Sequence, residues 1–364
     1  MLLRESKPYE PVPIERLCEG VRSLLRTELD TPYQLENVRW LAGGASKLQM
    51  AFDLQWDRPG VGRTSTPMVV RMEPAASVVE TSRLQEFQLV QGVGKVLPAP
   101  PCFWVDPDGD HFPYPALIYG FIDGVTKPRG KSSNVSGFGT GFPPDVREAL
   151  SSQFVDHLAA LHTWDWQNAG MTSFDIPKSG RHSVELVLNK WARIWEEDVI
   201  EDIPLWRYGM SWLRENIPDL ERPSMLHGDY RTGNFLYTER DNRITAWLDW
   251  ELGHPGDPHE DLALVTLGAL GNYAEDGKTF LISNLMTEDR FFEAYEAASG
   301  IRVDMKTLKY YRAFSAWRAV ASCVATGGRV TRNGKTHQDI VVTWLMALGY
   351  SLLEDLRSIL ETEI

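Results

Sequence analysis

Three polar side chains late in the sequence have the types and spacing needed for phosphate chemistry. Asp229 and Asn234 lie in one loop after the apolar segment Ser224–Leu226, and Asp249 ends a later apolar segment. The polar turn Glu239–Asn242 predicts a hairpin that would bring Asn234 and Asp249 side by side. An amide oxygen and a carboxylate that converge with phosphate oxygens suit octahedral Mg²⁺. Asp229 would be free to take a proton from an incoming hydroxyl group, so the chemistry indicated is phosphoryl transfer.

The composition is that of a globular protein large enough for two lobes. The chain has 364 residues, 43% hydrophobic and 24% charged, with a net charge of −13, which argues against a nucleic-acid partner and against an anionic membrane surface. Cys18, Cys102 and Cys323 show no disulfide or zinc framework, which fits a reducing compartment. With no apolar leader or membrane span, we expect a cytoplasmic protein, either a monomer or a homodimer.

The first part of the chain is predicted to be mostly β-structure. Apolar residues at helical spacing predict an amphipathic helix, and alternating segments bounded by turn residues predict an antiparallel meander. A polar turn, Asp57 to Thr66, separates two of the strands. The expected elements are a helix over Pro13–Arg26, strands over Leu35–Leu41, Leu48–Trp56 and Pro67–Met72, a helix over Ser77–Val90, and strands over Cys102–Val105 and Ala116–Tyr119.

The remainder is predicted to be mostly helical, after an exposed Gly/Ser-rich loop at Lys127–Gly141. We therefore expect an α+β protein with an N-lobe of residues 1–119 and a C-lobe of residues 120–364. The expected helices of the C-lobe are Pro144–Trp164, Ser183–Trp195, Pro204–Glu215, Lys306–Ala325 and Gln338–Leu360, and its short strands are Ser224–Leu226, Phe235–Tyr237 and Ile244–Leu248.

The motif region resembles a known enzyme superfamily. His227–Asn234 reads HGDYRTGN, Asp249–Glu251 reads DWE, and Gly256–Ala263 reads GDPHEDLA. This run is similar to the HxDxxxxN-plus-Asp pattern of the aminoglycoside phosphotransferase and choline kinase superfamily. It looks closest to the branch with the kinase domains of acyl-CoA dehydrogenase family members ten and eleven. The resemblance implies a bilobal protein-kinase-like fold that uses ATP and Mg²⁺, with Asp229 as the catalytic residue and Asn234 and Asp249 as metal ligands.

The resemblance also implies where the nucleotide would bind. The turn Gly43–Ser46 would cover the phosphates, with Gly44 and Ser46 as candidate ligands, although a plain β-turn is an equal alternative. It is neither a Walker A loop nor a GxGxxG loop.

Arg71 stands where most of the superfamily has a lysine, and it can still bind phosphate in bidentate fashion. Glu86 on the following helix would be its partner. The alternatives are an exposed cation at a strand end and a solvated helix face. The backbone around Tyr119 and Phe121 would hold adenine, which the resemblance alone suggests.

The acceptor is expected to be a hydroxylated small molecule whose hydroxyl group lies near Asp229. Tyr230, Arg231, Trp250 and Glu251 are the candidate walls. The helices before the motif are rich in tryptophan, and these rings are either core residues or part of an apolar acceptor pocket. The tryptophans concerned are Trp191, Trp195, Trp206 and Trp212. The acidic run Glu196–Asp202 could attract a polycation, but a solvated surface is the simpler interpretation.

Other polar residues of the motif have structural interpretations. We expect His227 to hold the loop rather than to carry protons, and Asp257 and Asp261 to cap and brace the helix that begins there. A zinc site could be drawn from His254, Asp257, His259 and Asp261. Pro255 and Pro258 break the helical register that such a site would need.

The sequence therefore predicts an ATP- and Mg²⁺-dependent kinase that acts on a hydroxylated acid, its thioester or another apolar metabolite. An antibiotic phosphotransferase or a choline-type kinase is a second hypothesis within the same class. A nucleotide-binding pseudokinase is a hypothesis of another class, supported only by the arginine in place of lysine.

Overall fold

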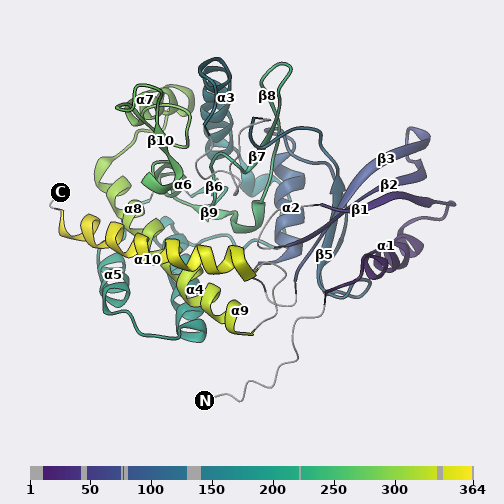
Figure 1. The fold of residues 1–364 in the computed structure, drawn as a ribbon, viewed down its shortest axis with the longest axis horizontal. Helices are drawn as coiled ribbons and strands as arrows, with labels where there is room; N and C mark the ends of the chain where they lie inside the picture. Colours follow the sequence, from purple (N-terminus) through teal and green to yellow (C-terminus); the bar gives the residue numbers. More distant parts are fainter. Residues whose placement is uncertain are drawn as a thin grey trace.

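The computed structural model describes residues 11–41, 47–74, 77, 81–128, 141–220, 223–333 and 339–362. Below, N-lobe denotes residues up to 119 and C-lobe the residues from 120. Figure 1 shows the antiparallel sheet and α1 (Ile14–Glu28) on one side of the molecule and most of the other helices on the other side, with α2 (Arg83–Val93) between them. This is the expected α+β arrangement. None of the helices in the described part of the chain is long and apolar enough to cross a membrane.

One five-stranded antiparallel sheet forms the N-lobe, in the order β1-β2-β3-β5-β4. Helix α1 (Ile14–Glu28) buries Leu17, Val21, Leu24 and Leu25 against this sheet, and its apolar face forms a separate N-lobe core with Met50, Phe52 and Met68 among others. The strands are β1 (Gln34–Trp40), β2 (Leu48–Arg58), β3 (Gly62–Met72), β4 (Cys102–Asp106) and β5 (Ala116–Gly120).

Strands β2 and β3 are longer than the sequence pattern predicted. Most of the polar stretch from Asp57 to Thr66 continues their ladder, so the turn is only the short tip between Arg58 and Gly62. The indole of Trp56 donates to the hydroxyl of Thr66 over 2.9 Å. Polar residues fit this extension because the hairpin tip projects into solvent, where no apolar alternation is needed.

Helix α2 (Arg83–Val93) begins later than the predicted Ser77, at an N-cap formed by Ser82, whose hydroxyl accepts from the Gln85 N–H. Leu89, Val90 and Val93 of this helix belong to the large core of the C-lobe. The helix therefore connects the two lobes and carries Glu86 to the boundary between them.

The C-lobe packs its helices around that core and around short two-stranded sheets (Figure 1). Its α-helices are α3 (Pro144–Thr163), α4 (Gly180–Asp198), α5 (Pro204–Glu215), α6 (His259–Val265), α7 (Glu288–Ser299), α8 (Met305–Val320), α9 (Gly327–Asn333) and α10 (Asp339–Glu361). The strands are β6 (Ser224–Leu226), β7 (Phe235–Thr238), β8 (Arg243–Trp247), β9 (His254–Gly256), β10 (Asn272–Tyr273) and β11 (Phe280–Leu281). Single turns are η1 (Trp166–Asn168), η2 (Trp250–Leu252) and η3 (Gly268–Leu270).

Three tryptophan rings from distant helices form one continuous stack in this core. Trp206 lies between Trp195, at a centroid distance of 4.0 Å, and Trp317, at 4.7 Å. Each indole of the Trp206–Trp317 pair donates to the backbone carbonyl of the other residue. Trp195 and Trp206 are thus core residues, and the apolar-pocket alternative does not apply to them. The predicted single helix over Lys306–Ala325 ends instead in a π-helical segment, η4 (Ala321–Thr326).

Candidate active site

The loop after β6 is shaped by a glycine that no other residue can replace. Gly228 has φ = 78°, and a Cβ atom there would lie 2.5 Å from the carbonyl oxygen of Leu252. Both the left-handed backbone and the close approach require glycine. The turn at Gly228 ends the strand and presents Asp229 at the boundary between the lobes.

Asp261 fixes the conformation of this loop through hydrogen bonds to its backbone. Its carboxylate accepts the backbone N–H groups of His227 over 2.8 Å and Gly228 over 2.9 Å, and it lies 3.2 Å from Nε2 of His162. Burial alone would raise the pKa of Asp261, but these donors more than offset it, so the pKa is lowered and the group stays ionised. Asp261 lies in the first turn of α6, as expected, but no side chain caps this helix. The backbone groups that Asp261 binds instead lie in the loop after β6, 33 and 34 residues earlier in the chain.

His227 holds the loop, as expected from the sequence. Its Nδ1 accepts the Asp229 N–H over 3.2 Å, so the ring proton is on Nε2, which donates to the carbonyl of Leu248 over 3.0 Å. Burial lowers the pKa of His227, which keeps the ring neutral in this arrangement. The ring therefore joins the loop to the end of β8 and is not available as a proton carrier.

Arg318 on α8 is a further support that was not predicted. Its guanidinium donates to the carbonyl of Gly228 over 2.8 Å and to Glu260 over 2.7 Å. Glu260 also faces His254, with Nε2 3.2 Å from the carboxylate. His259 instead pairs with Asp257, whose carboxylate also accepts the His259 N–H at the start of α6.

The two histidines considered for a zinc site therefore face different carboxylates. Among the described residues, no group of three or more His, Cys, Asp and Glu side chains is arranged to hold a metal ion.

Asp229 is held by two neighbours in the loop. Nε of Arg231 lies 3.0 Å and 3.1 Å from its two carboxylate oxygens, and the amide nitrogen of Asn234 donates to one of them over 2.6 Å. The same amide nitrogen donates to the Asp229 carbonyl over 2.8 Å. The Asp229 side chain is 25% exposed, so its carboxylate is fixed in orientation and still reachable by a substrate.

The hairpin β7–β8 brings Asn234 and Asp249 together as predicted. Phe235 pairs with Trp247, and the N–H of Leu248 donates to the Asn234 carbonyl over 2.7 Å. Because the amide nitrogen of Asn234 is used by Asp229, its amide oxygen is left for a cation. Asp249 follows in a left-handed conformation with φ = 65° and remains 31% exposed. One amide oxygen and one carboxylate fit a Mg²⁺ ion that takes its other ligands from phosphates and water.

Arg71 on β3 lies among carboxylates from both lobes. Its Nη2 donates to Asp249 and, over 2.8 Å, to Glu251, while its Nε lies 3.2 Å from Glu86. Burial alone would lower the pKa of Arg71, but the three carboxylates raise it well above its usual value. The pair expected between Arg71 and Glu86 is present, and Arg71 is buried rather than an exposed cation at a strand end.

Two more buried cations, Lys47 and Arg83, complete this network. Lys47 Nζ lies 2.8 Å from Glu73 and 3.2 Å from Glu251, and Arg83 contacts Glu73 over 3.0 Å and also pairs with Glu86. Neither cation was expected, although Arg83 precedes Glu86 by one helical turn. The interlobe charge network, as we call it below, consists of Lys47, Arg71, Arg83, Glu73, Glu86, Asp249 and Glu251.

The residues expected to hold adenine are only partly placed for it. The N–H of Phe121 donates to the Pro67 carbonyl over 2.9 Å, so this one backbone donor is used within the sheet. Tyr119 faces Arg71, and burial together with Glu86 raises the pKa of its phenol to about 12. The candidate phosphate ligands Gly44 and Ser46 lie outside the described residues.

Three of the four residues that were expected to line the acceptor site do not face the space beside Asp229. Tyr230 is fully buried, stacks on Trp247 at 4.0 Å, and donates to the Phe154 carbonyl. Trp250 is 2% exposed and donates to the Trp247 carbonyl. Glu251 belongs to the interlobe charge network. Aromatic rings beside a catalytic loop pack into the core because burial of their large apolar area is favourable. Of the four, Arg231 is the one beside Asp229.

A family model described as the phosphotransferase enzyme family matches residues 49–311. The chain belongs to this family. The match begins in β2 and ends in α8, so it covers the hairpin, the catalytic loop and most of the interlobe charge network. The phosphotransferase is therefore of the kinase type that its motifs suggested.

Solved structures share the fold at low identity. A candidate aminoglycoside phosphotransferase from Ralstonia eutropha aligns with 20% identity and a TM-score of 0.67, covering 94% of this chain and 97% of that one. APH(4)-Ia in complex with ADP and hygromycin B aligns with 15% identity and a TM-score of 0.57, covering 92% and 98%. Macrolide 2'-phosphotransferase type I aligns with 17% identity and a TM-score of 0.55, covering 96% and 99%. The fold is thus the protein-kinase-like fold of these phosphotransferases.

Curated relatives agree with the branch indicated by the sequence motif. Acyl-CoA dehydrogenase family member 11 of Pongo abelii is 24% identical over 210 residues, covering 55% of this chain and 26% of the relative. Family member 10 of Mus musculus is 23% identical over 265 residues, covering 70% and 24%. The chain spans about a quarter of the length of these relatives. This phosphotransferase therefore resembles one part of each relative, whereas the relative's name describes the whole protein.

Proposed function

We propose that this phosphotransferase moves the γ-phosphoryl group of ATP to a hydroxyl group of a small molecule. The observation that supports it best is the convergence of Asp229, Asn234 and Asp249 on one side and Arg71 on the other. These groups come from both lobes and meet at the boundary between them. We further propose that residues 1–119 bind the nucleotide and that residues 120–364 supply the catalytic loop and the acceptor site.

Each residue has one role in this proposal. Asn234 and Asp249 hold Mg²⁺, which neutralises charge on the phosphate oxygens when it is bound with the nucleotide. Arg71, fixed by Glu86, binds phosphate oxygens. Asp229 orients the acceptor hydroxyl and accepts its proton. Arg231 fixes the Asp229 carboxylate through both oxygens, so little reorganisation is needed when the acceptor arrives.

The adenine contact is proposed to lie one step further along the chain than the sequence suggested. The backbone N–H of Phe121 is occupied, whereas the N–H groups of Ile122 and Asp123 have no hydrogen-bond partner among the described residues. Backbone groups in this segment would therefore face the base.

The proposed acceptor is a hydroxylated acid, its thioester or another apolar metabolite. The curated relatives are named acyl-CoA dehydrogenase family members, and this name supports an acyl acid or its thioester over an antibiotic. The similar aminoglycoside and macrolide phosphotransferases share the fold, and fold alone does not set the acceptor.

An ADP-release assay with ATP and Mg²⁺ against an acceptor panel tests the proposal. The panel contains hydroxy acids, their CoA thioesters, aromatic alcohols, choline, aminoglycosides and macrolides. Asp229→Asn is the blank, and Asp241→Asn, at the exposed hairpin tip, is the matched control. Turnover of a hydroxy acid or thioester that disappears in Asp229→Asn and persists in Asp241→Asn supports the proposal. ATP binding without turnover in the wild type, across the panel, would favour the pseudokinase hypothesis.

A further inference from the structure

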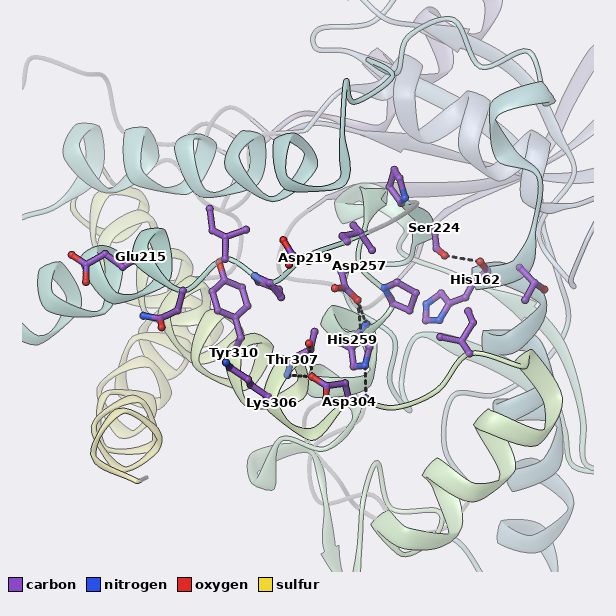
Figure 2. Close-up of a pocket in the computed structure, with 18 of the residues that line it drawn as sticks. His162, Glu215, Asp219, Ser224, Asp257, His259, Asp304, Lys306, Thr307 and Tyr310 are labelled. Carbon is purple, nitrogen blue, oxygen red and sulfur yellow. Dashed lines mark hydrogen bonds and ion pairs between the residues drawn. The ribbon is translucent and has the colours of Figure 1, made fainter. Parts of the chain in front are cut away.

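A cavity of about 970 Å³ in the C-lobe lies apart from the residues proposed to bind the nucleotide. Figure 2 shows it between the segment that follows α5, the start of α6 and the beginning of α8, where Tyr310 lines it. None of the described residues that line it belongs to the N-lobe or to the interlobe charge network. The base of the nucleotide must therefore be held elsewhere. The N-lobe sheet, which carries Arg71, is the surface to consider.

The two faces of the N-lobe sheet differ in what covers them. One face carries Met50 and Val70 and packs on α1. Side chains alternate along a strand, so Ala51, Val69 and Arg71 project from the other face, which we call the inner face. Ala51 and Val69 are 1% and 3% exposed, although neither belongs to the apolar core of either lobe. The inner face is thus a small apolar surface beside the arginine proposed to bind phosphate.

A β-bulge in β1 directs Arg39 to the inner face. The register of β1 against β2 shifts by one residue between Glu36 and Arg39, which places Arg39 opposite Ala51. Without this shift, Arg39 would project from the face that packs on α1. Asn37 lies in the bulge in a left-handed conformation with φ = 50°, and its side-chain amide donates to the carboxylate of Asp53 over 2.6 Å. The bulge therefore determines on which side of the sheet this cation lies.

Arg39 reaches across the inner face to Phe121. The guanidinium carbon of Arg39 lies 5.6 Å from the centre of the Phe121 ring. Strands β2 and β3 lie between β1 and β5 in the sheet, and Phe121 directly follows β5. The contact therefore spans the two strands that carry Ala51 and Val69. The guanidinium also donates to the Asn37 carbonyl over 3.3 Å, so its plane is held from both ends of this span.

The guanidinium of Arg39 remains available to a ligand. Its side chain is exposed, and no carboxylate of the described residues forms an ion pair with it, in contrast to the cations of the interlobe charge network. Guanidinium groups stack on aromatic rings and on nucleic-acid bases. Phe121 directly precedes Ile122 and Asp123, whose backbone N–H groups are proposed to face the base. A base held there would lie within reach of Arg39.

We propose that Arg39 is the base-stacking residue of the nucleotide site. This inference rests on the proposed function, in which residues 1–119 bind ATP. The guanidinium plane, oriented by Phe121, stacks on the purine ring, and Arg71, two strands away in the sheet, binds the phosphates. Stacking does not select between adenine and guanine, because every base presents a π-face. Arg39 therefore contributes affinity for a purine nucleotide without choosing between ATP and GTP.

Isothermal titration calorimetry with ATP and Mg²⁺ on the full chain tests this role. Arg39→Ala should weaken ATP binding roughly tenfold, and GTP binding by a similar factor, because the stacking surface is lost. Arg39→Lys keeps the charge but not the plane, so it should bind nearly as weakly. Arg39→Tyr restores a flat ring without the charge and should recover most of the affinity. Arg26→Ala removes an exposed cation from α1, on the opposite face, and should bind as the wild type does.

The outcomes separate this inference from the proposed function. Wild-type affinity in Arg39→Ala would overturn the stacking role and leave the proposed function intact, since ATP would still bind. Wild-type affinity in Arg39→Lys, or binding by Arg39→Tyr no stronger than by Arg39→Ala, would show that the charge acts rather than the plane, and would also overturn the stacking role. Absence of saturable ATP binding by the wild type would overturn both the stacking role and the proposed nucleotide site.

Discussion

Arg71 and Asp249, which are 178 residues apart, form a direct ion pair between the two lobes. The pair lies where the nucleotide phosphates and Mg²⁺ are proposed to bind. Asp249 therefore satisfies Arg71 in the structure described here, and both groups must exchange partners when the nucleotide and metal arrive. The pair helps to compensate the buried charge of Arg71 until then.

This exchange predicts opposite effects on binding and on turnover for Asp249→Asn. Arg71 then keeps Glu86 and Glu251 but loses the carboxylate that faces the proposed nucleotide site, so ATP binding measured in EDTA should become several-fold tighter. Turnover with Mg²⁺ should fall by more than about 100-fold, because the variant lacks one of the two proposed metal ligands. Calorimetric titration and the ADP-release assay measure the two effects. Unchanged affinity in EDTA would mean that the ion pair does not compete with the nucleotide.

Lys47 is predicted to stabilise the interlobe charge network. Its side chain is fully buried and contacts Glu73 and Glu251. Lys47→Met leaves both carboxylates without this cation, and the loss of unfolding free energy should be about 3–5 kcal/mol. Urea unfolding measures it. The double variant Lys47→Met/Glu251→Gln should recover part of the loss, and simple additivity of the two variants would contradict a direct interaction.

Asp261 is predicted to couple stability to catalysis. In Asp261→Asn one of the two loop N–H groups would face an amide NH₂ instead of an oxygen, at a cost of about 1–3 kcal/mol. The catalytic loop would also shift, so kcat should fall while the affinity for ATP is retained. Asp304→Asn is the matched control, because asparagine caps a helix as well as aspartate does. A wild-type kcat in Asp261→Asn would show that the loop does not depend on this anchor.

His157 is predicted to make stability depend on pH. Burial lowers its pKa from 6.5 to about 4, and its Nδ1 accepts from the Trp247 indole over 3.0 Å. Below pH 6.5 the unfolded chain binds a proton that the folded chain does not, so stability is present above pH 6.5 and is lost as the pH falls toward 4. The loss should reach about 3 kcal/mol near pH 4.

Urea unfolding of the wild type and of His157→Gln, between pH 7.5 and pH 4.5, checks this slope. The variant should be less sensitive to pH by about 2–3 kcal/mol over that range. His182→Gln, on the first turn of α4, is the control variant. Parallel pH profiles for the wild type and His157→Gln would show that another group is responsible.

Local features of the active site were predictable because short-range spacing determines them. The loop between β6 and β7 and the hairpin that follows fix the separation of Asp229, Asn234 and Asp249, whatever the rest of the chain does. The same holds for α5, whose predicted bounds match the structure, since prolines and apolar periodicity mark both its start and its face. The resemblance to the family motif suggested the roles proposed for these residues.

Long-range features were not predictable from spacing. The pattern around Asp249–Glu251 suggested one acceptor wall, but Trp250 packs inward while Glu251 joins cations from the N-lobe. Tyr230 follows Asp229 directly in the sequence and nevertheless points into the core. The side chains of consecutive loop residues project to opposite sides of the loop. The packing of the loop against the rest of the protein decides which of these side chains is buried.

The sequence by itself thus determined the family, the two-lobed α+β organisation and the loop that brings Asp229 and Asn234 together, because these depend on residue types at short, fixed intervals. Tertiary structure alone decided that Lys47 and Arg83 join Arg71, that Asp261 anchors Gly228, and that a cavity opens beside Tyr310. Each of these depends on side chains that are distant in sequence and meet only after the lobes have packed. These contacts are stabilised by burial of apolar surface and by compensation of charge, and neither can be predicted from a local sequence pattern.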